Sequence, residues 1–179
     1  MKHKNNKKSG FTLVEMLMYV AIITIVGSVI VVFIPQLTRK NAYLQAKSEV
    51  LDNMTSAIGI MAREIKHSST VYAPTTVFAV SPGQLSLETY YNTIPTEDTT
   101  FVDFYLDDNR LYVKREEQEA ELLVSDKIKI TSLIFTNLNA GGNYPVIRIV
   151  LTASYDSPSQ EVLEQSRITL TSTVSAREY

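Results

Sequence analysis

The sequence predicts an α+β protein in which one long N-terminal helix packs on a mostly antiparallel β-sheet. Two observations carry this prediction. Residues 11–37 are almost wholly apolar, and residues 38–68 continue with apolar side chains at helical spacing. Residues 69–179 instead alternate apolar and polar side chains in short runs separated by turn residues. A helix followed by a run of strands is typical of an α+β chain.

Residues 1–10 form a short basic leader that contains no acidic residue. Its four lysines are Lys2, Lys4, Lys7 and Lys8, whereas only Arg39 and Lys40 follow the apolar run closely. Positive charge is retained on the cytoplasmic side of a membrane span. The sequence therefore predicts a cytoplasmic N-terminus and an exported C-terminal domain, residues 69–179.

Residues 11–37 are predicted to span the membrane, and Glu15 is their only charged residue. The uncharged run from Met16 to Ile34 would extend about 28 Å as a helix, close to the thickness of a bilayer core. A buried core helix seldom lacks a polar face over so many turns. A cleaved signal peptide is the other alternative, but its apolar stretch is shorter and a small-residue cleavage site follows it.

The segment Gly10-Phe11-Thr12-Leu13-Val14-Glu15, between the lysine-rich leader and the apolar helix, resembles the processing signal of type IV prepilins and type II secretion pseudopilins. The resemblance covers the leader and the first half of the long helix. It implies that a prepilin peptidase cleaves after Gly10 and methylates Phe11 as the new N-terminus. Ser9 departs from the pattern, since Lys or Arg is frequent there. The resemblance also implies that other pilin or pseudopilin subunits are partners.

Glu15 is a carboxylate at the head of a membrane helix, and such a charge needs a partner. At the bilayer centre it costs about 2.5–3.5 kcal/mol, and less near the edge. Cleavage would create a cationic amine at Phe11. The resemblance implies that Glu15 meets this amine in a neighbouring subunit and sets the register of a filament. A solvated Glu15, favoured by the helix dipole, is the alternative.

Residues 38–68 are predicted to form an amphipathic helix. Apolar residues recur every seven positions at Leu37, Leu44, Leu51, Ile58 and Ile65, with Met54 and Met61 at a second position of the seam. We expect this stripe to pack on the sheet, and a short coiled coil is the alternative.

Gly27 and Pro35 interrupt the apolar half of the helix. Proline removes one helical hydrogen bond and clashes with the preceding turn, so a kink or a locally melted turn is expected at Pro35. In pilins that resemble this chain, such a segment can extend during assembly.

The remaining chain predicts seven or eight strands. Alternation is visible at residues 85–87, 102–106, 111–113, 128–130, 147–151 and 168–170. A tight hairpin is expected at Asp107-Asp108-Asn109, and further turns at Asn139–Asn143 and Ser157–Gln160. Ser132 to Leu138 breaks the alternation, which indicates a bulge.

The downstream half also resembles one subgroup of the family. The segments Ala62–Ile65, Val102–Leu111, Leu122–Ser125 and Ile130–Phe135 are similar in texture and order to J-type minor pseudopilins and W-type minor pilins. This similarity implies a minor subunit.

Composition and motifs argue against an enzyme. The chain has no Cys, which excludes a disulfide framework and a thiolate nucleophile, and a net charge of −2 disfavours a general nucleic-acid binder. His67 is the only histidine beyond the leader, and no G-x-S-x-G pattern exists. Asp103, Asp107 and Asp108 could bind Ca²⁺, but a solvated hairpin is the preferred interpretation. No metal, cofactor or small-molecule ligand is expected.

The sequence therefore predicts a minor pilin or pseudopilin, a structural subunit of a type IV pilus or a type II secretion-like filament in the periplasm or outside the cell. The alternative is a single-span, membrane-anchored binding domain of the cell envelope that never polymerises. Which machine the subunit serves, and whether it lies at the tip or along the shaft, stays open.

Overall fold

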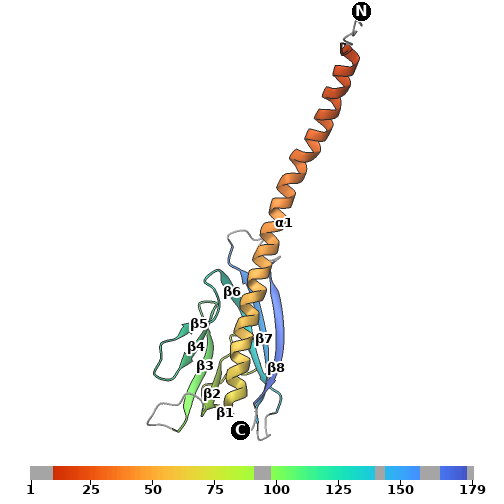
Figure 1. The fold of residues 1–179 in the computed structure, drawn as a ribbon. Helices are drawn as coiled ribbons and strands as arrows, with labels where there is room; N and C mark the ends of the chain where they lie inside the picture. Colours follow the sequence, from red (N-terminus) through yellow and green to blue (C-terminus); the bar gives the residue numbers. More distant parts are fainter. Residues whose placement is uncertain (1–9, 91–97, 140–143, 158–165, 177–179) are drawn as a thin grey trace, which may run out of the picture. The chain divides into compact units, whose positions relative to one another are not determined.

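The computed structural model describes residues 10–90, 98–139, 144–157 and 166–176 (Figure 1). Its elements there are α1 (Leu13–His67), β1 (Ser68–Val71), β2 (Leu85–Thr89), β3 (Thr100–Asp107), β4 (Arg110–Arg115), β5 (Glu121–Leu122), β6 (Ile128–Asn137), β7 (Val146–Tyr155) and β8 (Ile168–Ser175). The predicted α+β, pilin-like architecture of one long N-terminal helix and antiparallel strands is confirmed. The chain divides into two units, residues 1–42 and 43–179, which are described separately.

The first unit contains the apolar part of α1. Its side chains are exposed from Leu13 to Ile34, except that Gly27 is half-buried. The hydroxyl groups of Thr24 and Ser28 donate to carbonyls one turn back, at 2.7 Å each. These bonds satisfy the polar atoms within the helix itself, which is what an apolar surrounding requires.

The helix is continuous through Gly27 and Pro35. A locally melted turn at Pro35, one of the two outcomes expected from the sequence, is therefore not found in α1. The kink stays a prediction. Because proline has no N–H, the carbonyl of Val31 loses its helical donor even in a continuous helix.

The second unit holds two antiparallel sheets. One is five-stranded in the order β1-β2-β3-β4-β5, and the other is three-stranded in the order β6-β7-β8. Asp108 and Asn109 have φ angles of 44° and 59°, so the predicted hairpin is confirmed as a two-residue turn of the type that matches strand twist. The predicted turns at Asn139–Asn143 and Ser157–Gln160 lie partly outside the described residues.

The predicted bulge is close to its expected place. The register of β6 against β7 shifts between Ile130 and Ser132, and pairing is regular from Ser132 onward. The irregularity thus lies just before the segment that the sequence indicated. Because one extra residue reverses the facing of those after it, both Ile130 and Leu133 point into the core.

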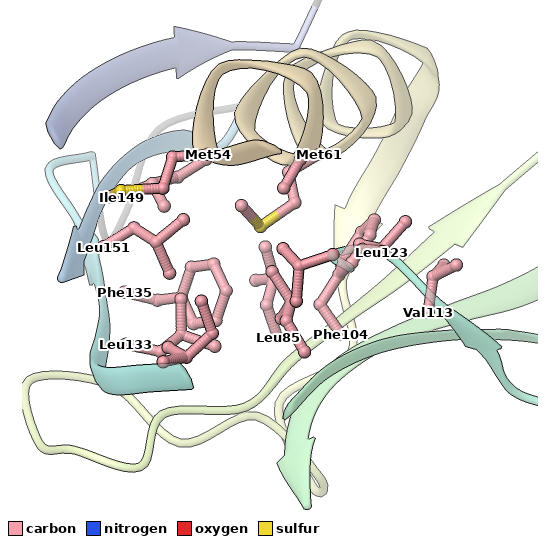
Figure 2. Packing of buried hydrophobic residues seen from close by; sticks show 14 of the residues in the cluster. Met54, Met61, Leu85, Phe104, Val113, Leu123, Leu133, Phe135, Ile149 and Leu151 are labelled. Carbon is pink, nitrogen blue, oxygen red and sulfur yellow. The ribbon is translucent and has the colours of Figure 1, made fainter. Parts of the chain in front are cut away.

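The core forms where one face of α1 meets both sheets, as Figure 2 shows. Met54 of α1 lies beside Ile149 of the three-stranded sheet, and Met61 lies above Leu85 of the five-stranded sheet and near Phe135 of the three-stranded sheet. All five side chains are fully buried. Burying each such side chain contributes about 1.5–3 kcal/mol. The expectation that the second half of the helix packs on a sheet is confirmed.

The buried face differs from the predicted seven-residue stripe. Its members are Ala46, Val50, Met54, Ala57, Met61 and Ile65. The prediction is correct at Met54, Met61 and Ile65, but it is wrong at Leu44 and Leu51, which are 59% and 42% exposed. A strict seven-residue repeat drifts by about 20° per heptad around a straight helix. Leu51 lies two heptads before Ile65 and Leu44 lies three, so this drift rotates both side chains away from the buried face.

The two sheets are joined through β6. Between β1 and β2, the N–H groups of Ala79 and Gly83 donate to the carbonyls of Phe135 and Leu133, each at 2.8 Å. A Cβ on Gly83 would lie 3.0 Å from the Leu133 carbonyl oxygen, so a residue without a side chain fits here best. These bonds occupy backbone groups of β6, which is an edge strand of its own sheet.

An ion pair ties α1 to the five-stranded sheet. Arg115, at the end of β4, donates to Glu64 of α1 at 2.8 Å, and more weakly to Glu121 at 3.4 Å. The Glu64 side chain is 10% exposed, whereas that of Glu121 is 68% exposed. The sequence predicted that residues 115–121 form a solvated strand end or turn. The strand end and the turn are confirmed, but Arg115 is half-buried and paired with Glu64.

We expect the two partners of Arg115 to differ in their effect on stability. Glu64→Gln should lower the free energy of unfolding by about 1–3 kcal/mol, because a charge-assisted bond of a largely buried carboxylate is lost. Glu121→Gln, the matched control, should change it by less than about 1 kcal/mol. Thermal unfolding of the full chain in detergent micelles, followed by circular dichroism, measures both. Equal shifts in the two variants would contradict the assignment.

Candidate functional site

The segment that carries the sequence motif forms the start of α1. Gly10 and Phe11 precede the helix, and Thr12 caps it. The Thr12 hydroxyl oxygen accepts the N–H of Glu15 at 3.3 Å, and the Thr12 carbonyl accepts the N–H of Met16 at 3.2 Å. Thr12 is therefore the N-cap residue, and Thr12-x-x-Glu15 has the sequence of a capping box.

The Gly10–Phe11 peptide bond lies outside the helix and is exposed. Apart from its chain neighbours, no atom of the described residues lies within 4 Å of the position that a Cβ on Gly10 would take. Packing against these residues therefore does not require glycine at residue 10. Phe11 is 69% exposed, and its ring contacts Tyr19 edge-on at 6.0 Å. An exposed, non-helical bond next to a capped helix is accessible to a peptidase.

Glu15 occupies the third helical position and is exposed. In the part of the chain that the structure describes, no cationic group forms an ion pair with its carboxylate. The unpaired N–H groups and the dipole of the helix N-terminus favour a negative charge at this place. The solvated alternative for Glu15 thus has a physical basis, and its carboxylate is also available to a partner outside the chain.

The motif residues and the helix-breaking residues lie far apart. Gly10, Phe11 and Glu15 are adjacent at the helix start, whereas Pro35 is twenty residues beyond Glu15. That separation is about 30 Å along a helix. Pro35 directly follows the apolar span Leu13–Ile34, which is 22 residues long and apolar enough to cross a membrane. The structure does not bring Pro35 to the processing segment.

His67 and the aspartates of the β3–β4 hairpin are the remaining polar candidates from the sequence, and they lie at the end of the helix and in the hairpin. His67 lies in the last turn of α1, as predicted, where a basic residue complements the helix dipole. Asp107 and Asp108 are exposed in the β3–β4 hairpin. Among the described residues, no group of three or more His, Asp or Glu side chains is placed to hold a metal ion.

The role of Thr12 was missed in the sequence analysis. Threonine was counted there only as one letter of the motif. The spacing of a hydroxyl residue and a Glu three positions later, directly before an apolar run, was the available signal for an N-cap.

Comparison with known proteins identifies the same segment. The prokaryotic N-terminal methylation motif, which is type IV prepilin-like, matches residues 5–31. No curated protein and no solved structure matches the chain. The motif supports a type IV pilin-like or pseudopilin-like protein and favours a structural subunit over an enzyme. The apolar helix is consistent with a single-pass membrane anchor.

We expect the cap to stabilise the first turn of α1. Thr12→Val removes the hydroxyl acceptor with little change of shape, at a cost of about 1 kcal/mol to the local helix. The Glu15 amide should then exchange with solvent roughly fivefold faster. Thr12→Ser keeps the acceptor and is the control. Hydrogen exchange on the full chain in lipid nanodiscs measures the rates, and identical rates in both variants would refute the capping role.

Proposed function

We propose that this protein is a minor pilin or pseudopilin, processed by prepilin peptidase and assembled through its N-terminal helix into a type IV pilus or a type II secretion-like filament. One observation carries the proposal. The methylation motif at residues 5–31 includes the start of a capped helix, and the span Leu13–Ile34 of this helix is apolar and exposed. A lipid bilayer and a bundle of like helices are the two surroundings in which such a surface is stable.

The proposed division of the chain follows from this. Residues 1–10 are a leader that is removed, residues 11–37 anchor and assemble the subunit, residues 38–68 pack on the sheet, and residues 69–179 form the exported domain. The lysines of the leader support a cytoplasmic N-terminus. The likeness of the strand region to J-type pseudopilins and W-type pilins supports a minor role.

Processing would hydrolyse the amide bond between Gly10 and Phe11. The carbonyl of Gly10 becomes a carboxylate on the released leader, and the nitrogen of Phe11 becomes an amine that then receives a methyl group. Packing against the described residues does not require glycine at residue 10, which supports a requirement set by the peptidase. A side chain at that position would intrude on the peptidase site.

Assembly would use the charge that processing creates. The Glu15 carboxylate has no cationic partner among the described residues, and a methylated amine keeps its positive charge. Pairing of Glu15 with the Phe11 amine of a neighbouring subunit would cancel both charges inside the membrane or filament. Gly27 and Pro35 would let the helix bend or extend as subunits pack. The apolar span would favour association with other helices on all of its sides, and the ion pair would fix the axial register of neighbouring subunits.

The second candidate is a single-span anchored binding domain that does not polymerise. The solvated position of Glu15 at the helix N-terminus favours it, because there the carboxylate needs no partner. The two candidates differ in processing, since a simple anchor keeps residues 1–10.

The first test of the proposal is the mature N-terminus. We expect protein from native membranes to begin at methylated Phe11, and Gly10→Val to remain uncut because its branched side chain obstructs the peptidase. Intact-mass measurement reads both. Ser9→Val, which adds bulk one residue earlier, is the matched control and should still be cut. A native chain that begins at Met1 or is cut near Thr38 would overturn the pilin proposal.

The second test concerns Glu15. Glu15→Val should be cut and inserted as well as the wild type, because an unpaired carboxylate has been removed from the span. Its recovery with partner subunits should fall sharply, since loss of one side of a buried ion pair costs about 3–5 kcal/mol. Glu15→Gln tests charge at constant shape, and Glu119→Gln, at an exposed site, is the control. Normal co-purification of both Glu15 variants would leave this residue without an assembly role.

A further inference from the structure

The outer face of the five-stranded sheet carries an aromatic and charged strip. Along β3, Val102 and Phe104 point into the core, so Phe101, Asp103 and Tyr105 lie on the opposite face. Their neighbours on β4 follow from the strand register: Asp103 is opposite Lys114, and Tyr105 is opposite Tyr112. None of these residues is used by the proposed processing or assembly.

A groove of about 360 Å³ opens on this face. The residues of its lining that bear on recognition are Tyr72, Phe101, Asp103, Lys114, Glu116 and Glu117. The rings of Tyr72 and Phe101 meet edge-on, with centroids 5.0 Å apart and planes inclined at 63°. The volume lies within the range of small-ligand sites, which combine aromatic walls with a few polar groups.

The charges of the groove are unpaired. Asp103 and Lys114 are directly opposite on neighbouring strands, yet no ion pair within 4 Å forms between them or with any other described residue. By contrast, Lys129 and Asp156 pair at 2.8 Å elsewhere on the same unit. One oxygen of Glu116 accepts the N–H of Phe101 at 3.1 Å. The groove therefore offers a free ammonium donor and free carboxylate acceptors beside exposed ring surface.

This combination favours a ligand with many hydroxyl groups and no negative charge. An anionic ligand would be repelled by the three carboxylates, which outnumber the single ammonium group of Lys114. A hydroxyl group donates to a carboxylate and accepts from an ammonium group, so it satisfies both kinds of charge. The apolar C–H face of a saccharide ring can cover the exposed ring of Tyr72. We propose that the groove binds a neutral carbohydrate chain.

The same strip indicates a chain of sugars and not a single ring. Tyr105 and Tyr112 stack with centroids 5.8 Å apart and planes inclined at 21°. Tyr105 follows Phe101 by four residues on β3, which is about 13 Å along the strand. The two aromatic pairs thus flank the Asp103–Lys114 pair on one face of the sheet. Such spacing suits an extended oligosaccharide that contacts an aromatic ring at each end.

The test uses the full chain in lipid nanodiscs, because sugar-based detergents would compete. The probes are cellotetraose and tetra-N-acetylchitotetraose, which distinguish glucose-based from N-acetylglucosamine-based chains as the natural source. Isothermal titration calorimetry measures binding. We expect one of the two to bind, and Tyr72→Ala to weaken its affinity roughly tenfold through the lost ring contact. Tyr90→Ala, an exposed tyrosine outside the groove, is the matched control.

Asp103→Ala provides a second variant and should weaken binding as well, while circular dichroism checks that each variant is folded. Binding of neither tetrasaccharide would overturn the proposal, and so would equal affinities of Tyr72→Ala and Tyr90→Ala. Tighter binding of a lysine hexapeptide or of a single-stranded oligonucleotide would assign the groove to another ligand class. This inference is independent of the proposed function, because processing and assembly can be intact in a protein that binds no sugar.

Discussion

Burial of one face of α1 against two separate sheets is the interaction on which the unit of residues 43–179 depends. The two sheets share few backbone bonds, among them those from Ala79 and Gly83 to β6. Their apolar faces become one core because Met54 lies against Ile149 of the three-stranded sheet and Met61 lies above Leu85 of the five-stranded sheet (Figure 2). Each sheet alone would leave its apolar face in water. The helix therefore determines the tertiary structure, and the Glu64–Arg115 ion pair adds a directional contact to a non-directional one.

The apolar part of the same helix meets a different physical requirement. From Leu13 to Ile34 its surface is apolar on all sides, so lipid and neighbouring helices satisfy it equally well. Such a surface stabilises association but does not fix the axial position of one helix against its neighbour. That position depends on the polar groups at the helix start, where Thr12 caps the helix and Glu15 carries the one charge of the segment 11–37. This separation of affinity from register is what the proposed filament assembly requires.

Much of the candidate site could be predicted from sequence because it is local. Gly10, Phe11 and Glu15 lie within six consecutive residues, and their spacing is set by the chain itself. The cap at Thr12 is equally local, because a hydroxyl residue three positions before a Glu is enough to predict it. The groove on the outer face of β3 and β4 was not predictable in this way. Tyr72 reaches Phe101 across 29 positions, and only the packing of strands brings them together.

The sequence by itself determined the apolar span, the fold class, most strands and the β3–β4 hairpin, because each depends on composition, periodicity or turn chemistry within a few residues. Tertiary structure decided which face of α1 is buried: Leu44 and Leu51 fit the repeat and are exposed, whereas Ala46 and Ala57 are buried. It also decided that Arg115 pairs with Glu64, 51 positions away. Burial depends on what a helix meets in space, and a one-dimensional pattern does not contain the rotation of the helix against its sheets.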